Sequence, residues 1–505
     1  GFNEVTDNGI NEGVTSSNLK PVVYIQTEVQ TSGSGTSEDP YTLTPSSDIN
    51  LVAYTLNGES TTKTYAELLT TNVVKNVTCK NGTTANWDNT DFSIKLKNIH
   101  TPDYCTIDFT DGYTVTLTAT NGTVNPSNVS VGYGGSAKFT VTPNSGFKAE
   151  LETNTCGGTL SGNIYTISNI TGNKTCTITF KPNLPTLLSQ ILADNPTRDT
   201  RTTFTAFTEN TTGTLFTATE KIGTNPEKEV YYYAGNTTNN WVKFANFYWR
   251  IIRTNYDGSI KLLYAGTSPD TTEGYIGRSA FNSTYKDPMY VGYKYGTTGS
   301  LENNRLNTND STIKTYVDNW YKNNLTAYTK YLSNDAVYCN DRTLASGQTY
   351  STTNNVEFAS SERIDTNKQP TYNCTNMSDA FSVNNTSAKL DYPVGLMTID
   401  ELSYAGGQYN TKLIKPFAWF YTNANGRIIT GNNSTWSLSP RSWNSSRSIV
   451  WFVGGYLYPG YLISEEVGSS VAVRPALSLK SCIKYSTGNG SSSNPYEIVE
   501  TTSGC

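Results

Sequence analysis

The fold of the larger part of this chain is decided by residues 435–479, TWSLSPRSWNSSRSIVWFVGGYLYPGYLISEEVGSSVAVRPALSL. Short apolar runs rich in Trp, Val, Ile and Tyr are separated here by Gly-Gly, Pro-Gly and Gly-Ser-Ser, a pattern typical of strands joined by tight turns. We expect a dense β segment that closes a C-terminal module. Its largest side chains, Trp436, Trp451 and Phe452, are expected in the core.

The rest of this module is expected to mix strands with helices. WVKFANFYWRIIR (241–253) and SIKLLYA (259–265) flank an Asp-Gly turn and predict a hairpin. Apolar residues at helical spacing predict a helix over 310–325, with Asp310 or Ser311 as its N-cap. Thr398 and Glu401 form a capping-box pattern.

The N-terminal part looks entirely different, because strict apolar–polar alternation dominates it. YTVTLTA (113–119), AKFTVTP (137–143) and CTITFKP (176–182) alternate clearly, and turn residues recur about every ten positions. Residues 111–182 are therefore predicted to form a β-sandwich. Residues 46–110 are predicted to form a second small β domain, in which 62–72 could be a short helix.

The two ends of the chain repeat one another. Residues 16–43, SSNLKPVVYIQTEVQTSGSGTSEDPYTL, match 469–498, SSVAVRPALSLKSCIKYSTGNGSSSNPYEI, with Lys20-Pro21 on Arg474-Pro475. Such a duplication is typical of a modular array, and it predicts a joint between units. The alternative is that the first copy is the tail of a preceding module, and we read the Gly1-Phe2 start as processed or truncated. The expected organisation is a terminal segment 1–45, β domains 46–110 and 111–182, a module 183–482 and a tail 483–505.

The composition limits the cellular compartments and the classes of partner that are expected. Only 16% of the residues are charged and the net charge is −5, with no basic run, so nucleic acid is not an expected partner. No apolar run reaches the roughly 18 residues of a membrane span. The eight cysteines fall into near neighbours within one predicted domain each, which indicates disulfides and an extracellular protein. The pairs are Cys79/Cys105, Cys156/Cys176, Cys339/Cys374 and Cys482/Cys505.

The residue inventory argues against catalysis. The chain has a single histidine, His100, in a predicted surface loop. A catalytic triad or metal site that uses histidine would have to be built on this one residue. No metal ligands, no cofactor and no catalytic residues are predicted. A carbohydrate-active enzyme would need two facing carboxylates, which a sequence does not place.

Several motifs carry a resemblance to known families. VGYGGSAKFTVTPNSGFKAE (131–150) resembles the Ig-like, InlB-type repeats of bacterial surface proteins. WSLSPRSW (436–443) and VAVRPALSL (471–479), with YPVGLMTIDELSYAGG upstream, resemble the C-type-lectin-like modules of gut Firmicutes and Mollicutes-like bacteria. The resemblance covers roughly 200–499. It implies a mainly β, multidomain protein: two Ig-like β-sandwich domains followed by an α+β lectin-like module.

The same resemblance extends to the variable proteins of diversity-generating retroelements, which carry changeable residues on this C-terminal segment. Aromatic, Arg and Asn side chains suit such a binding face. The tryptophan and tyrosines among the candidates could instead belong to the core. Arg474 is expected to be structural. The candidate ligand-binding residues are Arg441, Trp443, Asn444, Ser445, Arg447, Tyr456, Tyr458 and Tyr461.

These observations predict a non-catalytic adhesin on a bacterial cell surface. Its ligand would be a glycan or a protein of a host or of another microbe, bound by a lectin-like module carried on β stalk domains. The alternative is a subunit of an extracellular filament or pilus, in which copies join head-to-tail through their terminal strands. An extracellular carbohydrate-active enzyme is the third hypothesis.

Overall fold

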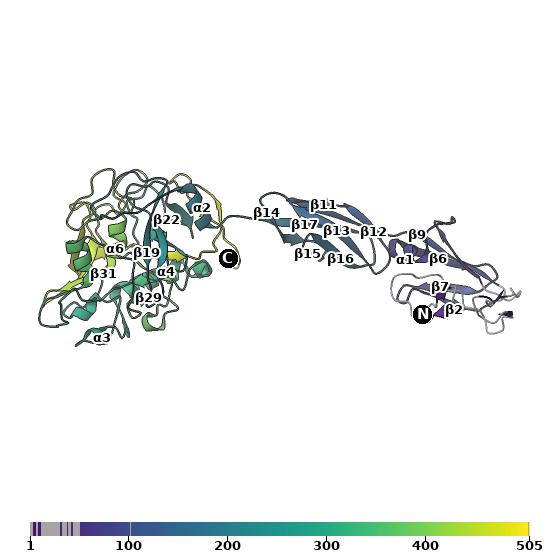
Figure 1. Ribbon diagram of the computed structural model, residues 1–505, viewed down its shortest axis with the longest axis horizontal. Coiled ribbons are helices and arrows are strands. Elements are labelled where there is room, and N and C mark those ends of the chain that lie inside the picture. Colours follow the sequence, from purple (N-terminus) through teal and green to yellow (C-terminus); the bar gives the residue numbers. More distant parts are fainter. Residues whose placement is uncertain are drawn as a thin grey trace. The chain divides into compact units, whose positions relative to one another are not determined.

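The computed structural model describes residues 51–100, 103–502 and 504–505, together with the short stretches 4–6, 9–11, 31–32, 38 and 42–43. The chain divides into two compact units, Gly1–Asn183 and Leu184–Cys505 (Figure 1). Strands predominate, in several separate sheets, so the expected mainly β, multidomain architecture is confirmed.

The first part of the N-terminal unit is a three-stranded sheet with a helix. The order is β5-β9-β6, with β9 parallel to β5 and antiparallel to β6, and β7 pairs with β8 in a separate hairpin. The elements are β5 (Leu51–Leu56), α1 (Tyr65–Thr71), β6 (Asn72–Cys79), β7 (Thr84–Asp88), β8 (Ser93–Lys97) and β9 (Tyr104–Asp111).

This arrangement differs from the two-sheet Ig-like sandwich expected for 46–110. Thr64 and Glu67 form a reciprocal capping box, which starts α1. The helix then buries Tyr65 and Leu68 in a cluster with Ile107 and Phe109 of β9. A helix covers the face of the sheet on which a second sheet was expected, because local capping and apolar spacing favour it.

Residues 113–182 form two four-stranded sheets around one core, as a sandwich requires. Ala137, Phe139 and Val141 point inward from one strand and meet Leu117 and Ile178 of the other sheet. The first sheet is β12 (Asn128–Val131), β10 (Tyr113–Thr120), β17 (Lys174–Pro182) and β14 (Phe147–Asn154). The second is β11 (Gly122–Asn125), β13 (Gly135–Pro143), β16 (Ile164–Ile170) and β15 (Thr159–Ser161).

The C-terminal unit is built on a ten-stranded sheet. Its main path runs β18 (Thr197–Asp199), β19 (Thr214–Glu220), β20 (Lys228–Tyr232), β22 (Phe247–Thr254), β21 (Trp241–Phe244), β37 (Tyr496–Ile498) and β36 (Tyr485–Thr487). From β22 a branch continues through β23 (Ile260–Tyr264), β35 (Pro475–Leu479) and β30 (Val394–Leu396).

The stretch 435–479 is divided between this sheet and a six-stranded one. β35 lies in the ten-stranded sheet, and the preceding strands form the other. The six-stranded sheet comprises β24 (Arg278–Ser279), β34 (Val471–Ala472), β31 (Thr435–Trp443), β32 (Ser448–Val453), β33 (Leu462–Glu466) and β28 (Val356–Glu357). Trp436 and Trp451 are buried and Phe452 is half-buried against the core, as predicted.

The predicted helix starts of this unit are confirmed. Ser311 caps α4 (Thr312–Asn324), which buries Ile313 and Val317. Thr398 and Glu401 form the capping box of α6 (Ile399–Tyr404). The remaining helical segments are α2 (Leu187–Asp194), α3 (Leu301–Asn304), α5 (Ala359–Ser361), η1 (Pro288–Val291), η2 (Thr326–Tyr331), η3 (Glu362–Asn367) and η4 (Thr386–Ala388). Two further strand pairs are β25 (Lys294–Tyr295) with β26 (Asn309–Asp310) and β27 (Tyr338–Cys339) with β29 (Ala380–Phe381).

Residues 483–505, expected as a tail outside the module, are part of its main sheet. β37 pairs in parallel with β21, and Tyr496 and Ile483 are fully buried. Tyr496 also donates a hydrogen bond of 2.7 Å to Asp194. The expectation of a separate tail is wrong because this segment completes the edge of the sheet.

The repeated ends share a hairpin as well as a sequence. β3 (Thr31–Ser32) pairs with β4 (Thr42–Leu43), and Ser32 lies opposite Thr42. In the second copy Thr487 of β36 lies opposite Glu497 of β37, which is the equivalent pair. The copied strand at 20–29 lies outside the described residues. β1 (Glu4–Thr6) pairs with β2 (Gly9–Asn11).

All four predicted disulfides are present. They join Cys79 to Cys105, Cys156 to Cys176, Cys339 to Cys374 and Cys482 to Cys505. Four disulfides indicate an oxidising compartment, so the protein is secreted or extracellular. None of the helices in the described part of the chain has the length and apolar character that crossing a bilayer requires.

Candidate functional site

The predicted ligand-binding residues separate into one buried residue, one packed residue and two exposed turns. Trp443 is only 3% exposed, so its predicted place on a binding face is wrong. It ends β31 between two partner strands, opposite Val356 of β28 and Ser448 of β32. A substitution of Trp443 would therefore report on folding rather than on binding.

Arg441 is half-buried and packed against its neighbours. Its guanidinium lies 5.1 Å from the ring centre of Trp451 and 5.6 Å from that of Tyr409. The same group lies 3.5 Å from a carboxylate oxygen of Asp365. These contacts hold it to the interior face of the six-stranded sheet.

The turn between β31 and β32 is exposed but electrically balanced. The Asn444 side chain accepts hydrogen bonds from the backbone N–H groups of Ser446 and Arg447, which closes the turn. Ser445 sits in it with a positive φ of 62°. Arg447 forms a 2.6 Å ion pair with Glu466, so its charge is matched within the chain.

The loop between β32 and β33 carries the most exposed apolar side chains of the site. Tyr456, Leu457 and Tyr458 are 63%, 74% and 52% exposed, and we call these three residues the tip. Tyr461 is half-buried, and its ring centre lies 5.4 Å from that of Tyr458. Leu457 was not among the predicted residues, although its position between two tyrosines could have indicated it.

The tip is mounted on a tightly packed base. Side chains at Gly454 and Gly455 would collide with the carbonyls of Tyr458 and Asn432, so only glycine fits there. The Gly455 N–H donates to Ser434, and its carbonyl accepts from the Tyr421 hydroxyl, both at 3.0 Å. The backbone at the base of the tip is therefore held in place, which lowers the entropy lost on binding.

A second loop lies against the tip. The Leu413 N–H donates a 2.8 Å hydrogen bond to the carbonyl of Pro459, and Leu413 packs on Gly460. The next residue, Ile414, is 71% exposed and extends the apolar surface. Because Lys415, Pro416 and Phe417 follow directly, the same loop forms one wall of a groove.

This groove has a volume of about 630 Å³ and was not predicted from the sequence. Its other wall is the loop 423–426, held by Asn423, whose side chain donates to the carbonyls of Asp270 and Thr271. Trp241 and Arg250 lie at its floor. The segments that meet here are far apart in the sequence, so no local motif predicts the groove.

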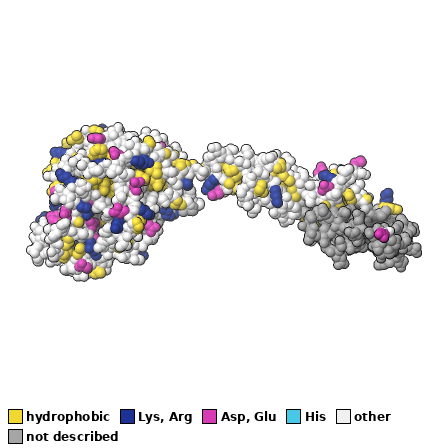
Figure 2. Space-filling model, in the orientation of Figure 1, with side chains coloured by type: hydrophobic (Ala, Val, Ile, Leu, Met, Phe, Trp, Pro, Cys, Tyr) yellow, Lys and Arg dark blue, Asp and Glu magenta, His cyan; other side chains and the backbone are white. Residues whose placement is uncertain are grey.

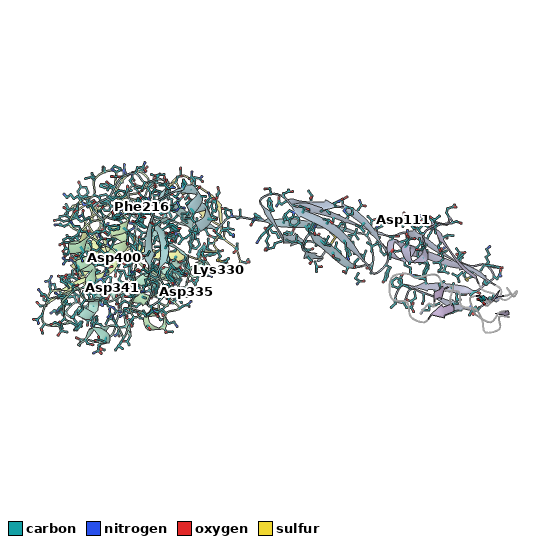
Figure 3. The ribbon with its side chains drawn as sticks, viewed as in Figure 1. Asp111, Phe216, Lys330, Asp335, Asp341 and Asp400 are labelled. Atoms are coloured by element: carbon teal, nitrogen blue, oxygen red, sulfur yellow. A yellow bond between two sulfur atoms is a disulfide. The ribbon has the colours of Figure 1, made fainter. Side chains whose placement is uncertain are left out.

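Three groups of charged side chains lie elsewhere in the unit. In the first, Glu401 accepts from Arg253 at 2.8 Å and from Lys261 at 2.7 Å, and Glu220 also pairs with Arg253. Burial alone would raise the pKa of Glu401, but Lys261 and Arg253 hold it below its usual value. Arg363 similarly joins Asp341 and Asp400, both labelled in Figure 3, at 2.9 Å each.

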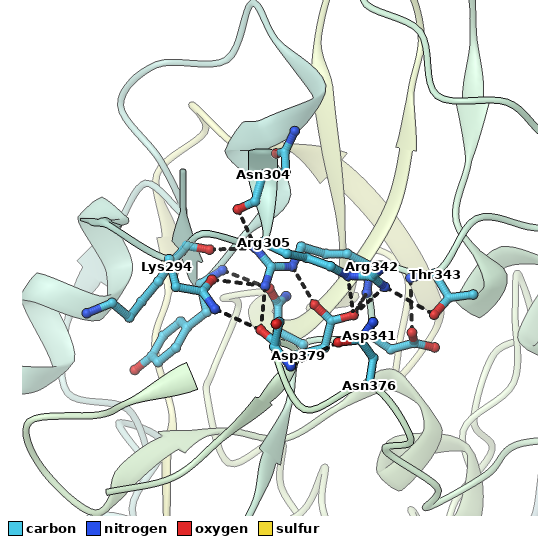
Figure 4. A network of polar contacts seen from close by, with 12 residues as sticks. Lys294, Asn304, Arg305, Asp341, Arg342, Thr343, Asn376 and Asp379 are labelled. Carbon is cyan, nitrogen blue, oxygen red and sulfur yellow. Dashed lines mark hydrogen bonds and ion pairs between the residues drawn. The ribbon is translucent and has the colours of Figure 1, made fainter. Parts of the chain in front are cut away.

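The second group surrounds Arg342, which is fully buried (Figure 4). Its Nε donates to Asp379 at 2.8 Å. The two terminal nitrogens donate to the carbonyls of Lys294, Asn304 and Ser378 and to the side chain of Asn307. Every N–H of this guanidinium has an acceptor.

In the third group a lysine stands where a metal ion would otherwise fit. The carboxylates of Asp310, Asp318 and Asp391 come within 4.8 Å of one another. The Lys314 ammonium contacts all three, at 3.0, 2.5 and 2.7 Å. Burial raises the pKa of Asp318 to about 6 in spite of Lys314, and the two other carboxylates add to the shift.

The exposure of Arg474 and of His100 shows where these two residues from the sequence analysis lie. Arg474 is 5% exposed and donates to the carbonyl of Tyr264 at 3.0 and 2.9 Å, so its structural role is confirmed. His100 is exposed in the loop before β9. On the face drawn in Figure 2, the charged side chains of the C-terminal unit are interspersed without a single-sign area.

Comparison of the chain with protein-family models, curated proteins and solved structures finds no match. Only the residues and their geometry therefore bear on the function of the protein.

Proposed function

We propose that the protein is an extracellular, surface-displayed bacterial adhesin without catalytic activity. Its C-terminal unit would be a lectin-like recognition module, and its N-terminal β units would be the spacer that carries it. The ligand would be a glycan or protein on a host or microbial surface. The observation that carries the proposal is the tip, three adjacent exposed apolar side chains on a rigid base. Aromatic anchors of this kind supply much of the energy of recognition.

The tip supports binding rather than packing within the chain. Large apolar side chains in contact are usually removed from water, because each contributes roughly 1.5–3 kcal/mol when buried. Tyr456, Leu457 and Ile414 remain more than 60% exposed and lie on adjoining loops. A ligand that covers them would recover this energy without a change in the fold.

The test replaces Tyr456, Leu457 and Tyr458 by Ser together in the full chain. We expect the labelled wild-type protein to bind a printed glycan array or host or bacterial cells, and the variant to lose at least about tenfold in affinity with an unchanged Tm. Leu306→Ser is the matched control, because Leu306 is 59% exposed and not part of the tip. Equal binding by the wild type and the tip variant would refute the proposal.

A second candidate, a filament subunit, is favoured by one observation. The first copy of the duplicated segment forms a hairpin, β3–β4, in which the pair Ser32–Thr42 is equivalent to the pair Thr487–Glu497 of β36–β37. In the C-terminal unit that hairpin completes the sheet edge at β21, where main-chain hydrogen bonds fix the register. The copy would give one molecule a means of joining another.

Electron microscopy of non-reduced protein distinguishes the two candidates. A filament subunit should form regular fibres, and deletion of residues 1–43 should leave single particles. Fibres that persist after this deletion would exclude the terminal hairpin as the joint. Single particles from the intact chain would leave the adhesin as the better account.

A further inference from the structure

The floor of the groove holds a buried arginine that no carboxylate neutralises. Arg250 is 1% exposed. Its Nε donates to Asn240 at 2.6 Å, and its terminal nitrogens donate to the carbonyls of Thr422 at 3.3 Å and Thr237 at 3.1 Å. A guanidinium has five N–H groups, so two have no acceptor among the described residues.

Arg474 is likewise buried and donates only to neutral carbonyls, but of these two arginines only Arg250 lines the groove. Such pairing is costly. A buried charge is normally paired, because its removal from water is otherwise uncompensated. Burial lowers the pKa of Arg250 well below its usual value, and the nearby Arg474 lowers it further. An anion placed at the groove would supply the missing countercharge.

The groove adds a second cation and a neutral polar rim. Lys415 lines the wall and is exposed, and none of the lining residues, all of which the structure describes, is Asp or Glu. The rim offers amide and hydroxyl groups from Asn236, Thr238, Asn425 and Ser492. Trp241 holds the arginine from one side, with its ring centre 4.2 Å from the guanidinium carbon.

We propose that this groove binds a carboxylate-bearing saccharide. The carboxylate would face Lys415 and the Arg250 guanidinium, whose planar fork matches two carboxylate oxygens. The sugar hydroxyls would exchange hydrogen bonds with the Asn, Thr and Ser side chains of the rim. A volume of about 630 Å³ lies within the range of small-ligand pockets and accommodates a sugar of one or two rings.

The chemistry of the rim favours a sugar over an acidic peptide or a simple anion. Four neutral side chains with both donors and acceptors suit a ring bearing several hydroxyls, whereas a simple anion needs only donors. This inference goes beyond the proposed function, because it concerns a different surface from the tip. The tip variant leaves the groove intact, so each proposal can fail without the other.

The experiment measures binding of sodium glucuronate to the full chain by calorimetry or ligand-observed NMR. Glucose tests the sugar without the charge, acetate tests the charge without the sugar, and a Glu-rich hexapeptide and inorganic sulfate test the rival anions. We expect glucuronate to bind at least about tenfold more tightly than any of the four. Equal or tighter binding of glucose, acetate, peptide or sulfate, or no binding of glucuronate, would overturn the proposal.

Two variants locate the site. Lys415→Glu reverses an exposed charge on the wall and should weaken glucuronate binding at least about tenfold, with an unchanged Tm. Lys389→Glu, an equal charge change at an exposed lysine outside the groove, should leave binding unchanged. Arg250→Lys keeps the charge but removes the fork and should also weaken binding. Binding that is unaffected by Lys415→Glu, or that falls equally in Lys389→Glu, would refute the assignment.

Discussion

Arg342 and Arg250 are both buried in the C-terminal unit, yet their hydrogen-bond and charge partners differ. Arg342 donates all five of its N–H groups and is paired with Asp379, which Arg305 also contacts at 2.6 Å. Arg250 donates three hydrogen bonds to neutral acceptors only. The first site is complete within the chain, whereas the second lines an open groove and lacks a countercharge.

Arg342 stabilises the fold through its carboxylate partner, whereas Arg250 lines a groove that a ligand could enter. Lys314 stands at the opposite extreme, since it meets three carboxylates. The three cations differ in the number of carboxylates that they contact. Among the residues that the structure describes, Lys314 contacts three, Arg342 contacts one and Arg250 contacts none. Because an unpaired buried charge costs free energy, Arg250 is the cation of the three at which a ligand would gain most.

The largest expected effect is on stability. Arg342→Met leaves Asp379 buried with the partly exposed Arg305 as its charged partner, so the free energy of unfolding should fall by about 3–5 kcal/mol. Arg250→Met strands no carboxylate and should cost about 1–2 kcal/mol. Denaturant unfolding followed by tryptophan fluorescence reports on this unit, since every tryptophan except Trp87 lies in it. Equal losses of unfolding free energy in the two variants would contradict the proposed difference between the two arginines.

The next largest effect is a pH dependence of the stability, caused by Asp318 beside Lys314. The pKa of Asp318 is raised by burial to about 6, so the folded state binds its proton more tightly than the unfolded state. Lowering the pH from 7.5 to 5 should therefore stabilise the wild type relative to Asp318→Asn, on the order of 1–2 kcal/mol. The stabilisation should disappear again as the pH rises through 6. Parallel stability curves for the two proteins would contradict this.

A third prediction supplies Arg250 with the carboxylate it lacks. Asn240→Asp places an acid at the oxygen that already accepts from Nε at 2.6 Å. Once the guanidinium is neutralised, glucuronate binding should weaken about tenfold, or about 1.4 kcal/mol, while the circular dichroism spectrum stays unchanged. The matched change at the complete site, Asn307→Asp beside Arg342, should leave binding unaltered. Unweakened binding in Asn240→Asp would show that the charge of Arg250 does not act on the ligand.

The smallest effect is a dependence on salt. Lys415 is exposed and its attraction to a carboxylate is screened, so raising NaCl from 50 to 500 mM should weaken glucuronate binding about threefold. The buried network of Arg342 is shielded from salt, and the stability difference between wild type and Arg342→Met should not change. Titration calorimetry at both salt concentrations checks the first expectation, and urea unfolding checks the second.

The sequence by itself determined the features that depend on neighbours along the chain. Alternation in 113–182 predicted the sandwich, and the caps at Ser311 and at Thr398 with Glu401 predicted two helix starts. Closeness in sequence also predicted all four disulfides. Among the candidate site residues, Asn444, Ser445, Arg447, Tyr456 and Tyr458 are exposed as expected. Period and spacing are local properties, and a strand or helix obeys them wherever it is placed.

Only the tertiary structure decided which side chains are covered and which charges remain unpaired. Trp443 is buried, and its end of β31 pairs with β28, about 90 residues earlier in the chain. Residues 483–505 became part of the main sheet because β37 joins β21. Arg250 meets the carbonyl of Thr422, 172 residues away, at the floor of the groove. The burial of a side chain and the electrostatic potential around it depend on all the segments that pack against it. The sequence pattern of a single segment does not contain that information.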